Sequence, residues 1–290
     1  DNTMSLLKYR AFVETVDLGS FTKAAEALHC TQPGISHMIR DLETEWGVTL
    51  LERDRTGVRV TSDGVRLLER ARDVCEAHSR LLADVDEAHG LQTGHIRIGT
   101  LSSVGTHWLP HMIQRFQQDF PNIDYELLLG DYVEIEEWIL QGRVDCGFLR
   151  LPVRSGLKPT FLRKDRLMAI LPAKHPLARR KVFPVAAFRS EPFLLLEKGA
   201  RNEIADLLDT HGVTPAIRFK TWDDYTIMAM VEKGLGIGIL PELILRRVPF
   251  KISVKVLDVP AHRDIGFVVR EGRNVSLAVK KFMTYLEVPV

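Results

Sequence analysis

Residues 20–47 read SFTKAAEALHCTQPGISHMIRDLETEWG, and this stretch holds two helical patterns separated by a short turn. Apolar side chains return every three or four residues in both patterns. Ser20 and Thr31 stand where N-cap residues are expected, and Gly47 stands where a helix ends. The stretch therefore predicts two packed helices. Their apolar positions are Phe21, Ala24, Ala25, Leu28, Ile35, Ile39, Leu42 and Trp46.

The second of these helices has a polar face opposite its apolar one, at about 100° per residue. A further helical pattern precedes the pair at residues 6–16, and LLERDRTGVRV at residues 50–60 predicts a small hairpin with a basic tip. A helix with one packed face can lay its small polar face in a major groove about 12 Å wide. Helix, helix, turn, helix and wing together form an arrangement that reads DNA. The candidate DNA-contacting residues are Thr31, Gln32, Pro33, Ser36, His37, Arg40, Arg53 and Arg55.

Several short motifs carry a resemblance to a known family. They are FTKAAEAL at 21–28, TQPGIS at 31–36, IRDLE at 39–43, LLER at 50–53 and TSDG at 61–64. Together they resemble the winged helix-turn-helix of LysR-type transcriptional regulators, from which the chain departs at Trp46 and Leu51, where the family usually has Leu and Phe. The resemblance implies a homodimer or homotetramer that binds an interrupted palindrome in double-stranded DNA, with RNA polymerase as a further partner.

The side chains of the polar face suit different parts of DNA. Gln32, Ser36 and Arg40 can hydrogen-bond base edges or phosphates, and Pro33 can touch a thymine methyl group. Thr31 can cap the helix and also meet a phosphate.

Two arginines of the hairpin extend the same surface. Arg53 and Arg55 would reach the DNA backbone or a narrow minor groove. The alternative is that both are solvated surface charges.

Residues 63–90 predict one long linker helix. From Gly64 onward apolar or neutral residues recur at alternating intervals of four and three positions. This spacing is a heptad seam, and charged residues flank it. The seam predicts a dimerisation helix, and the alternative is a helix lying on its own domain. The candidate dimerisation residues are Leu67, Ala71, Val74, His78, Leu81 and Val85.

Residues 91–290 alternate between strand and helix patterns, which is typical of an α/β domain. The predicted fold class is therefore a multidomain α plus α/β protein, with a winged helix-turn-helix at 4–62, a linker helix at 63–90 and an effector-binding domain at 91–290. This last part resembles the periplasmic-binding-protein type II-like effector domain of the same family. The resemblance implies lobe one at 94–165 and 269–290, and lobe two at 166–268. The predicted elements are strands at 95–100, 124–129, 144–150, 193–196, 216–221, 237–240, 252–256 and 265–270, a strand near 167, and helices at 108–120, 133–141, 203–211, 225–233 and 275–286.

A small-molecule effector is expected between the two lobes, where strand ends and helix N-termini meet. Ser102 and Ser103 could instead be plain N-caps, and Arg150 could instead form a structural salt bridge. The candidate effector-binding residues are Thr100, Ser102, Ser103, Gly130, Asp131, Arg150, Lys198, Arg201, Trp222 and Asp223.

The charges among these candidates leave the effector open. Arg150 with Arg201 or Lys198 favours an anion such as a small carboxylate, whereas Asp131 and Asp223 could equally select an amine. An amino acid or another amphoteric metabolite would satisfy both signs.

Length, composition and charge exclude several classes of protein. The chain has 290 residues, 45% hydrophobic and 27% charged, which is an ordinary globular composition. It shows neither a long apolar run nor a basic segment followed by an apolar one, so a cytoplasmic protein is expected. The three cysteines are far apart, which argues against a disulfide framework or a zinc site, and no metal or cofactor is expected. The net charge of +1 says nothing about partners.

Three other functions compete with that of a regulator. A hydrolase is disfavoured because Ser102 and Ser103 lack the GxSxG elbow, and GLGIG at 234–238 is not a dinucleotide motif, so the protein is not expected to be an enzyme. A solute-binding protein is disfavoured by the DNA-reading domain. A thiol redox-sensing regulator is disfavoured because no two cysteines are close in sequence and Cys146 lies inside a predicted strand.

Overall fold

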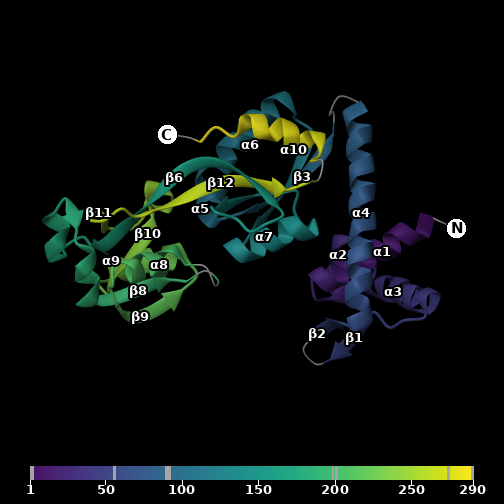
Figure 1. The fold of residues 1–290 in the computed structure, drawn as a ribbon, viewed down its shortest axis with the longest axis horizontal. Coiled ribbons are helices and arrows are strands. Elements are labelled where there is room, and N and C mark those ends of the chain that lie inside the picture. The colour runs from purple at the N-terminus through teal and green to yellow at the C-terminus, as the bar shows by residue number, and fades with distance from the viewer. Residues whose placement is uncertain are drawn as a thin grey trace. The chain divides into compact units, whose positions relative to one another are not determined.

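The computed structural model describes residues 3–54, 57–88, 93–197, 199, 202–272 and 275–288. The chain forms two compact units, Asp1–His89 and Gly90–Val290, and each is described by itself (Figure 1). Within the described ranges no helix is long and apolar enough to cross a membrane.

The first unit is helical apart from one hairpin. Its core contains Phe12, Ile35 and Leu42, each with no exposed surface. The strands of the hairpin pair antiparallel, Leu51 opposite Val60. The elements are α1 (Thr3–Asp17), α2 (Phe21–Ala27), α3 (Gln32–Trp46), β1 (Leu51–Asp54), β2 (Gly57–Val60) and α4 (Ser62–Ala88).

The N-caps predicted for two helices are confirmed. The Ser20 hydroxyl accepts a hydrogen bond from the Lys23 amide, and the Thr31 hydroxyl accepts one from the Gly34 amide, both at 3.3 Å. Gly47 ends α3 in the left-handed conformation, which costs glycine little. One Glu43 carboxylate oxygen then accepts from the backbone amides that lead into β1, at 2.8 and 3.2 Å, and so holds the hairpin to α3.

The long helix α4 joins the first unit through its beginning. A Cβ on Gly64 would overlap the carbonyl oxygen of Leu50, so only glycine allows the helix to lie this close to the hairpin. Arg72 of α4 forms an ion pair with Asp17 of α1, and both side chains are 13% exposed. These contacts fix the first turns of α4 on the helical core.

The second unit is built on one ten-stranded sheet. Along the sheet the strand order is β4-β3-β5-β12-β6-β10-β8-β9, with β11 paired to β6 and β7 paired to β11. The strands are β3 (Gly94–Thr100), β4 (Ile123–Leu129), β5 (Cys146–Arg150), β6 (Leu157–Pro172), β7 (Val182–Phe183), β8 (Pro192–Leu196), β9 (Ala216–Thr221), β10 (Ile237–Pro241), β11 (Ile252–Leu257) and β12 (His262–Arg270).

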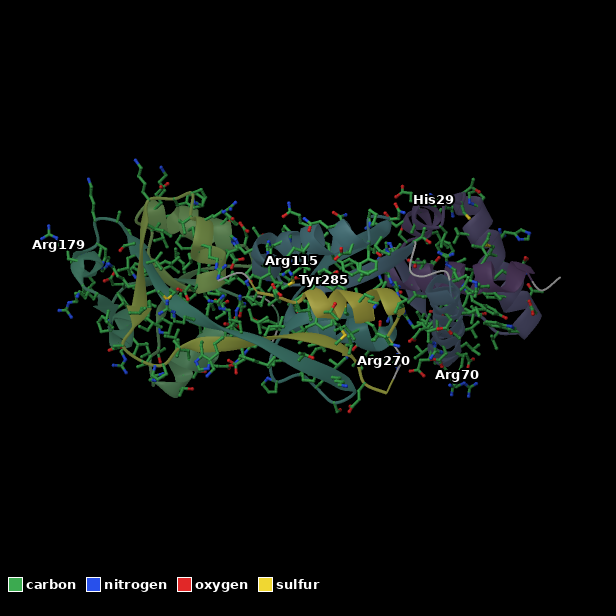
Figure 2. All side chains as sticks on the ribbon, turned by 90° about the horizontal axis from the view of Figure 1, so that it is seen from above. His29, Arg70, Arg115, Arg179, Arg270 and Tyr285 are labelled. Carbon is green, nitrogen blue, oxygen red and sulfur yellow. The ribbon has the colours of Figure 1, made fainter. Side chains whose placement is uncertain are left out.

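Helices separate most of these strands along the chain. At the C-terminal end, Tyr285 of η4 packs edge to face on Phe116 of α6, near Arg115 (Figure 2). The helices are α5 (Ser102–His107), α6 (Leu109–Asp119), α7 (Tyr132–Gln141), α8 (Glu203–Thr210), α9 (Asp224–Glu232) and α10 (Leu277–Phe282), with short 3₁₀ helices η1 (Pro176–Arg179), η2 (Val185–Arg189), η3 (Glu242–Arg247) and η4 (Met283–Tyr285).

Two apolar cores divide this unit into lobes. Lobe one surrounds Trp108, Phe116 and Phe148, and lobe two surrounds Phe183, Phe188 and Phe193. The antiparallel strands β6 and β12 connect the lobes: β6 pairs with β12 up to Arg166 and with β10 from Leu167. On β12, Ile265, Phe267 and Val268 belong to the core of lobe one. The second segment of lobe one therefore begins at or before Ile265, and not at residue 269 as predicted.

The sequence patterns placed most elements but missed some. The strand expected near residue 167 begins at Leu157. Its first half escaped the prediction because it is polar and shows no clear alternation of apolar and polar residues. Helix α5 and the strand β7 were not predicted. The helix expected over 275–286 is only Leu277–Phe282 followed by a 3₁₀ turn.

The tight approach at Gly64 gives the first prediction. Gly64→Ala should lower the free energy of unfolding of the first unit by about 1–3 kcal/mol, because the added methyl group forces α4 away from Leu50. Hydrogen exchange of α4 amides in the full chain measures this. Ser79→Ala, on an exposed position of the same helix, is the control and should change stability by less than about 0.5 kcal/mol. Equal exchange in the two variants would contradict the steric argument.

Candidate functional site

The polar face of α3 lines a hollow on the first unit. Gln32, Pro33, Ser36 and Arg40 lie along it, and the hairpin contributes Leu51. Thr31 is exposed, and its hydroxyl caps the helix. The structure thus places five of the predicted DNA-contacting residues on or beside one concave surface.

Two charged side chains of α3 have partners within the unit. The Arg40 Nε donates to the Ser36 carbonyl at 3.3 Å, which lays the guanidinium along the exposed helix surface. His37 is paired with Asp41 at 3.2 Å, and Lys8 lies 3.1 Å from the same carboxylate. The hydrogen bond from Lys8 lowers the pKa of Asp41. The imidazole of His37 therefore lies beside an ionised carboxylate.

The two wing arginines are only partly described. Arg53 lies in β1, where only its backbone is described, and Arg55 lies outside the described residues. Their contacts with DNA stay predictions.

The heptad seam of α4 divides into two parts. Ala71 is 4% exposed and belongs to the core of the first unit, with Leu67 packed against that core. These two residues pack within their own unit, because the start of α4 lies on α1, and their role in dimerisation stays a prediction. His78 is half-buried, and the exposed part of the seam is Val74, Leu81 and Val85, with exposed fractions of 45%, 59% and 43%.

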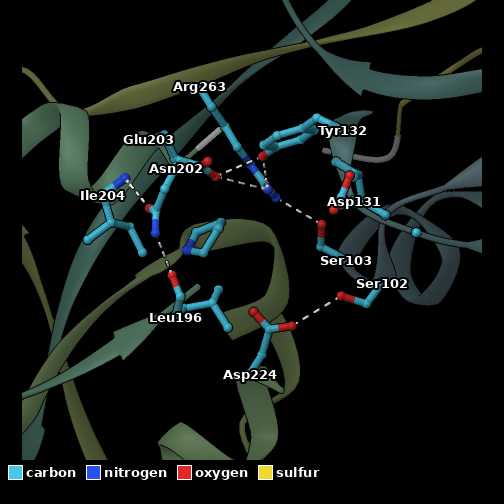
Figure 3. Close-up of a pocket in the computed structure, with 13 residues that line it drawn as sticks. Ser102, Ser103, Asp131, Tyr132, Leu196, Asn202, Glu203, Ile204, Asp224 and Arg263 are labelled. Carbon is cyan, nitrogen blue, oxygen red and sulfur yellow. Dashed lines mark hydrogen bonds and ion pairs between the residues drawn. The ribbon is translucent and has the colours of Figure 1, made fainter. Parts of the chain in front are cut away.

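In the second unit, a pocket lies between the two lobes (Figure 3). Its cavity volume is about 40 Å³, which is space for only a few water molecules in this arrangement of the lobes. The lining residues from lobe one are Leu101, Ser102, Ser103, Gly130, Asp131 and Tyr132, and the others are Leu196, Asn202, Glu203, Ile204, Asp224, Pro241 and Arg263.

Arg263 is the polar centre of this pocket. Its Nε donates to Asp165 at 2.9 Å, and its Nη2 donates to the Ser103 hydroxyl at 2.8 Å. Its Nη1 donates to the Tyr132 hydroxyl at 3.0 Å. Burial by itself lowers the pKa of Arg263, but Tyr132, Asp165 and Glu203 outweigh burial and raise that pKa above its ordinary value. The guanidinium is therefore charged at any physiological pH.

Carboxylates of lobe two meet donors of lobe one. The Tyr132 hydroxyl donates to Glu203 at 2.8 Å, and the Ser102 hydroxyl donates to Asp224 at 3.1 Å. Burial raises the pKa of Tyr132, so its hydroxyl keeps its proton and remains a donor. These hydrogen bonds join α7 to α8 and α5 to α9 across the pocket.

Four of the predicted effector-binding residues line the pocket, namely Ser102, Ser103, Gly130 and Asp131. Asp131 also caps α7, since its carboxylate accepts from two backbone amides at 2.8 Å. A Cβ on Gly130 would lie 2.5 Å from the Trp138 ring, so this position admits glycine only. Lys198 and Arg201 lie outside the described residues.

Four other predicted residues do not line the pocket, and this corrects the expectation. Thr100 is fully buried and its hydroxyl donates to the Leu101 carbonyl. Arg150 donates to Asp206 at 3.2 Å, which is the structural salt bridge named as its alternative. Trp222 is 61% exposed, and Asp223 caps α9 by accepting from the Thr226 amide.

Sequence reasoning missed five lining residues that matter chemically. Three of them, Tyr132, Asn202 and Asp224, directly follow residues that were predicted, and Glu203 follows Asn202. The local patterns gave no signal for Arg263, which comes from the middle of β12. Its partners Asp165 and Ser103 lie 98 and 160 positions away in sequence.

No cysteine is among the described residues that line the pocket. Cys146 is fully buried, and burial raises the pKa of its thiol well above the ordinary value. Burial also raises the pKa of Cys75. In the described part of the chain no group of three or more His, Cys, Asp and Glu could hold a metal ion.

Comparisons with known proteins cover both units. Residues 6–65 match the family described as bacterial regulatory helix-turn-helix protein, lysR family, and residues 89–288 match the LysR substrate binding domain. The uncharacterized HTH-type transcriptional regulator YvbU of Bacillus subtilis is 30% identical over 97% of each chain.

Two solved structures are similar over nearly the whole chain. An H2O2-bound OxyR mutant from Corynebacterium glutamicum shares 25% identity with a TM-score of 0.62, over 97% of this chain and 91% of that one. Full-length CbnR in complex with its target DNA shares 22% identity with a TM-score of 0.68, over 97% and 98%, and shows the likeness of fold. With both family models matched, the chain belongs to the LysR family of DNA-binding transcriptional regulators, with an effector-binding domain after its helix-turn-helix.

Proposed function

We propose that this protein controls transcription in response to a small molecule bound between the two lobes of its second unit. The observation that carries the proposal is the pocket, whose lining comes from both lobes and whose polar groups pair across it. A ligand in this place contacts both lobes, and a ligand that fits one arrangement of the lobes better than another shifts the balance between them. A small carboxylate or an amino-acid-like metabolite is the proposed effector.

DNA binding is assigned to the exposed polar face of α3 and to the wing. Gln32, Ser36 and Arg40 are the proposed contacts to base edges and phosphates, with Pro33 against a thymine methyl group. Arg53 and Arg55 are the proposed contacts of the wing to the backbone or the minor groove. Because the partner is DNA, we place the protein in the bacterial cytoplasm.

Two copies are proposed to pair through the exposed half of α4, and pairs can associate further into a tetramer. An exposed row of apolar side chains on a helix is stabilised by burial against a second copy. A change in the lobes would then alter how the copies associate, and with it the spacing of two winged helices on an interrupted palindrome.

Neither rival function gains support from the site. A solute-binding protein would need the pocket but not the helix-turn-helix. A thiol sensor would need a reactive cysteine, and Cys146 is buried with a raised pKa.

The first prediction here concerns α3. Arg40→Ala in the full chain should weaken binding to its selected DNA site about tenfold or more, because an arginine contact to a base is worth about 1–3 kcal/mol. The site is first selected from a random duplex library, and affinity is then measured by fluorescence anisotropy at physiological salt. Arg70→Ala makes the same chemical change at an exposed position of α4 and should keep full affinity. Equal affinity of both variants would remove Arg40 from the interface.

The second prediction concerns the exposed seam of α4. Val74→Glu should shift the protein toward monomers in sedimentation experiments, because it places a charge in the dimer contact. Val65→Glu is the matched control: Val65 is 52% exposed, and nine residues at about 100° each place it on the opposite side of the helix. A dimer that survives Val74→Glu as well as Val65→Glu would rule out this seam.

The third prediction separates the effector-gated regulator from the thiol sensor. Cys146 in the folded protein should resist alkylation by iodoacetamide at pH 8, because its thiol is buried and protonated. In denaturant the same residue should react at the rate of a free cysteine. Mass spectrometry of the peptide that contains Cys146 measures both rates. Rapid alkylation in the native state would favour redox sensing.

A further inference from the structure

One side of the Arg263 guanidinium is fixed by the fold. Asp165 of β6 is the direct cross-strand partner of Arg263 on β12, and the two side chains are 4% and 6% exposed. The other oxygen of Asp165 accepts from the Leu243 amide at 2.9 Å. Asp165 therefore cannot leave Arg263 without breaking the strands that connect the lobes.

The other side of the guanidinium faces the pocket, and its carboxylate partner there lies at a longer distance. Nη1 lies 3.0 Å from the Tyr132 hydroxyl and 3.5 Å from a Glu203 oxygen, which is the longest hydrogen bond described for this guanidinium. Glu203 is the first residue of α8, and this helix belongs to lobe two. Its second oxygen lies 4.0 Å from the Arg150 guanidinium, so a second cation is within reach of the same carboxylate.

The charges around Arg263 limit how a negatively charged ligand can bind there. Among the described lining residues Arg263 is the one cation, and it already faces the carboxylates of Asp165 and Glu203. A third carboxylate would be buried without a counter-charge, which is unfavourable. An anionic ligand can therefore bind Arg263 only by replacing one of the two carboxylates. Glu203 is the one that the fold allows to move.

We propose that Glu203 is an internal ligand of the pocket, and that the effector is an anion whose carboxylate displaces Glu203 from Arg263 and Tyr132. This inference rests on the proposed function, which it deepens by naming the charge of the effector and the residue it competes with. The incoming carboxylate takes the donors Nη1 of Arg263 and the Tyr132 hydroxyl, and Glu203 turns to Arg150. The apolar body of the effector lies against Leu101, Leu196 and Ile204.

Displacing Glu203 also changes how the lobes are joined. The hydrogen bond from Tyr132 to Glu203 links α7 with α8, and exchange for a ligand carboxylate replaces this direct link with one through the ligand. The effector therefore replaces a direct hydrogen bond between the lobes, in addition to filling the space between them.

Glu203→Gln tests the proposal, because the sign of its effect differs for anions and cations. Benzoate and benzylamine are probes of similar size and opposite charge, and their binding to the full chain is measured by calorimetry. Removing the competing charge should raise benzoate affinity about tenfold, as expected for a hydrogen-bonded charged group. Unchanged or weaker benzoate binding overturns the proposal, as does a gain for benzylamine. A loss of benzylamine binding with no gain for benzoate assigns the pocket to cations instead.

Two further variants complete the test. Glu242→Gln removes the same charge from an ion pair with Arg166 outside the pocket lining and should leave benzoate affinity as in the parent. Adding Tyr132→Phe to Glu203→Gln should cancel the gain, because the donor that the benzoate carboxylate takes is gone. If the gain persists in the double variant, the proposed exchange is wrong. Circular dichroism shows whether each variant is folded.

The proposed function can fail separately. DNA binding by the same proteins is measured with the selected duplex, and a chain that binds no duplex refutes the regulator. A chain that binds DNA but gains no benzoate affinity in Glu203→Gln refutes only the internal ligand.

Discussion

The second unit depends on the buried ion pair of Arg263 and Asp165. The pair sits on β6 and β12, which are the strands shared by the two lobes, and it is almost completely excluded from water. A buried charge without its partner is strongly destabilising, so neither residue can be lost alone. The pair therefore fixes the register of the crossover and, at the same time, presents Nη1 of Arg263 to the pocket. One interaction serves both the strands that connect the lobes and the proposed ligand site.

Around this fixed pair, three polar contacts between the lobes share one arrangement of charges. The lobe-two partners are carboxylates at or near helix N-termini, and the partners in lobe one are hydroxyl groups or a guanidinium. Carboxylates are favourable near a helix N-terminus because of the helix dipole. The same carboxylates make lobe two acidic toward the pocket, so an anionic ligand has to compete with them. In the proposed function, the contacts between the lobes and the charge of the ligand therefore involve the same side chains.

The sequence allowed much of this fold to be predicted, and the failures have a physical pattern. Apart from α5, the helices and strands up to Arg150 follow from apolar periodicity and from caps such as Thr31, because these signals are local. The first half of β6 has no such signal, since it is stabilised by pairing with β12, about a hundred residues later. Ser102, Ser103, Gly130 and Asp131 were placed in the pocket by their position after strands. Arg263 could not be, because its role depends on partners far away in sequence.

The linker helix shows how a short segment can serve two purposes. Its first turns are fixed to the helical core by Gly64, Ala71 and the ion pair of Arg72 with Asp17, so this end of α4 moves with the recognition helix α3. Val74 and the apolar residues beyond it remain exposed and are available to a second copy. Both groups belong to one continuous helix, so under the proposed pairing the exposed half would set the direction in which each helix-turn-helix points. A change in that pairing would then change the distance between the two α3 helices.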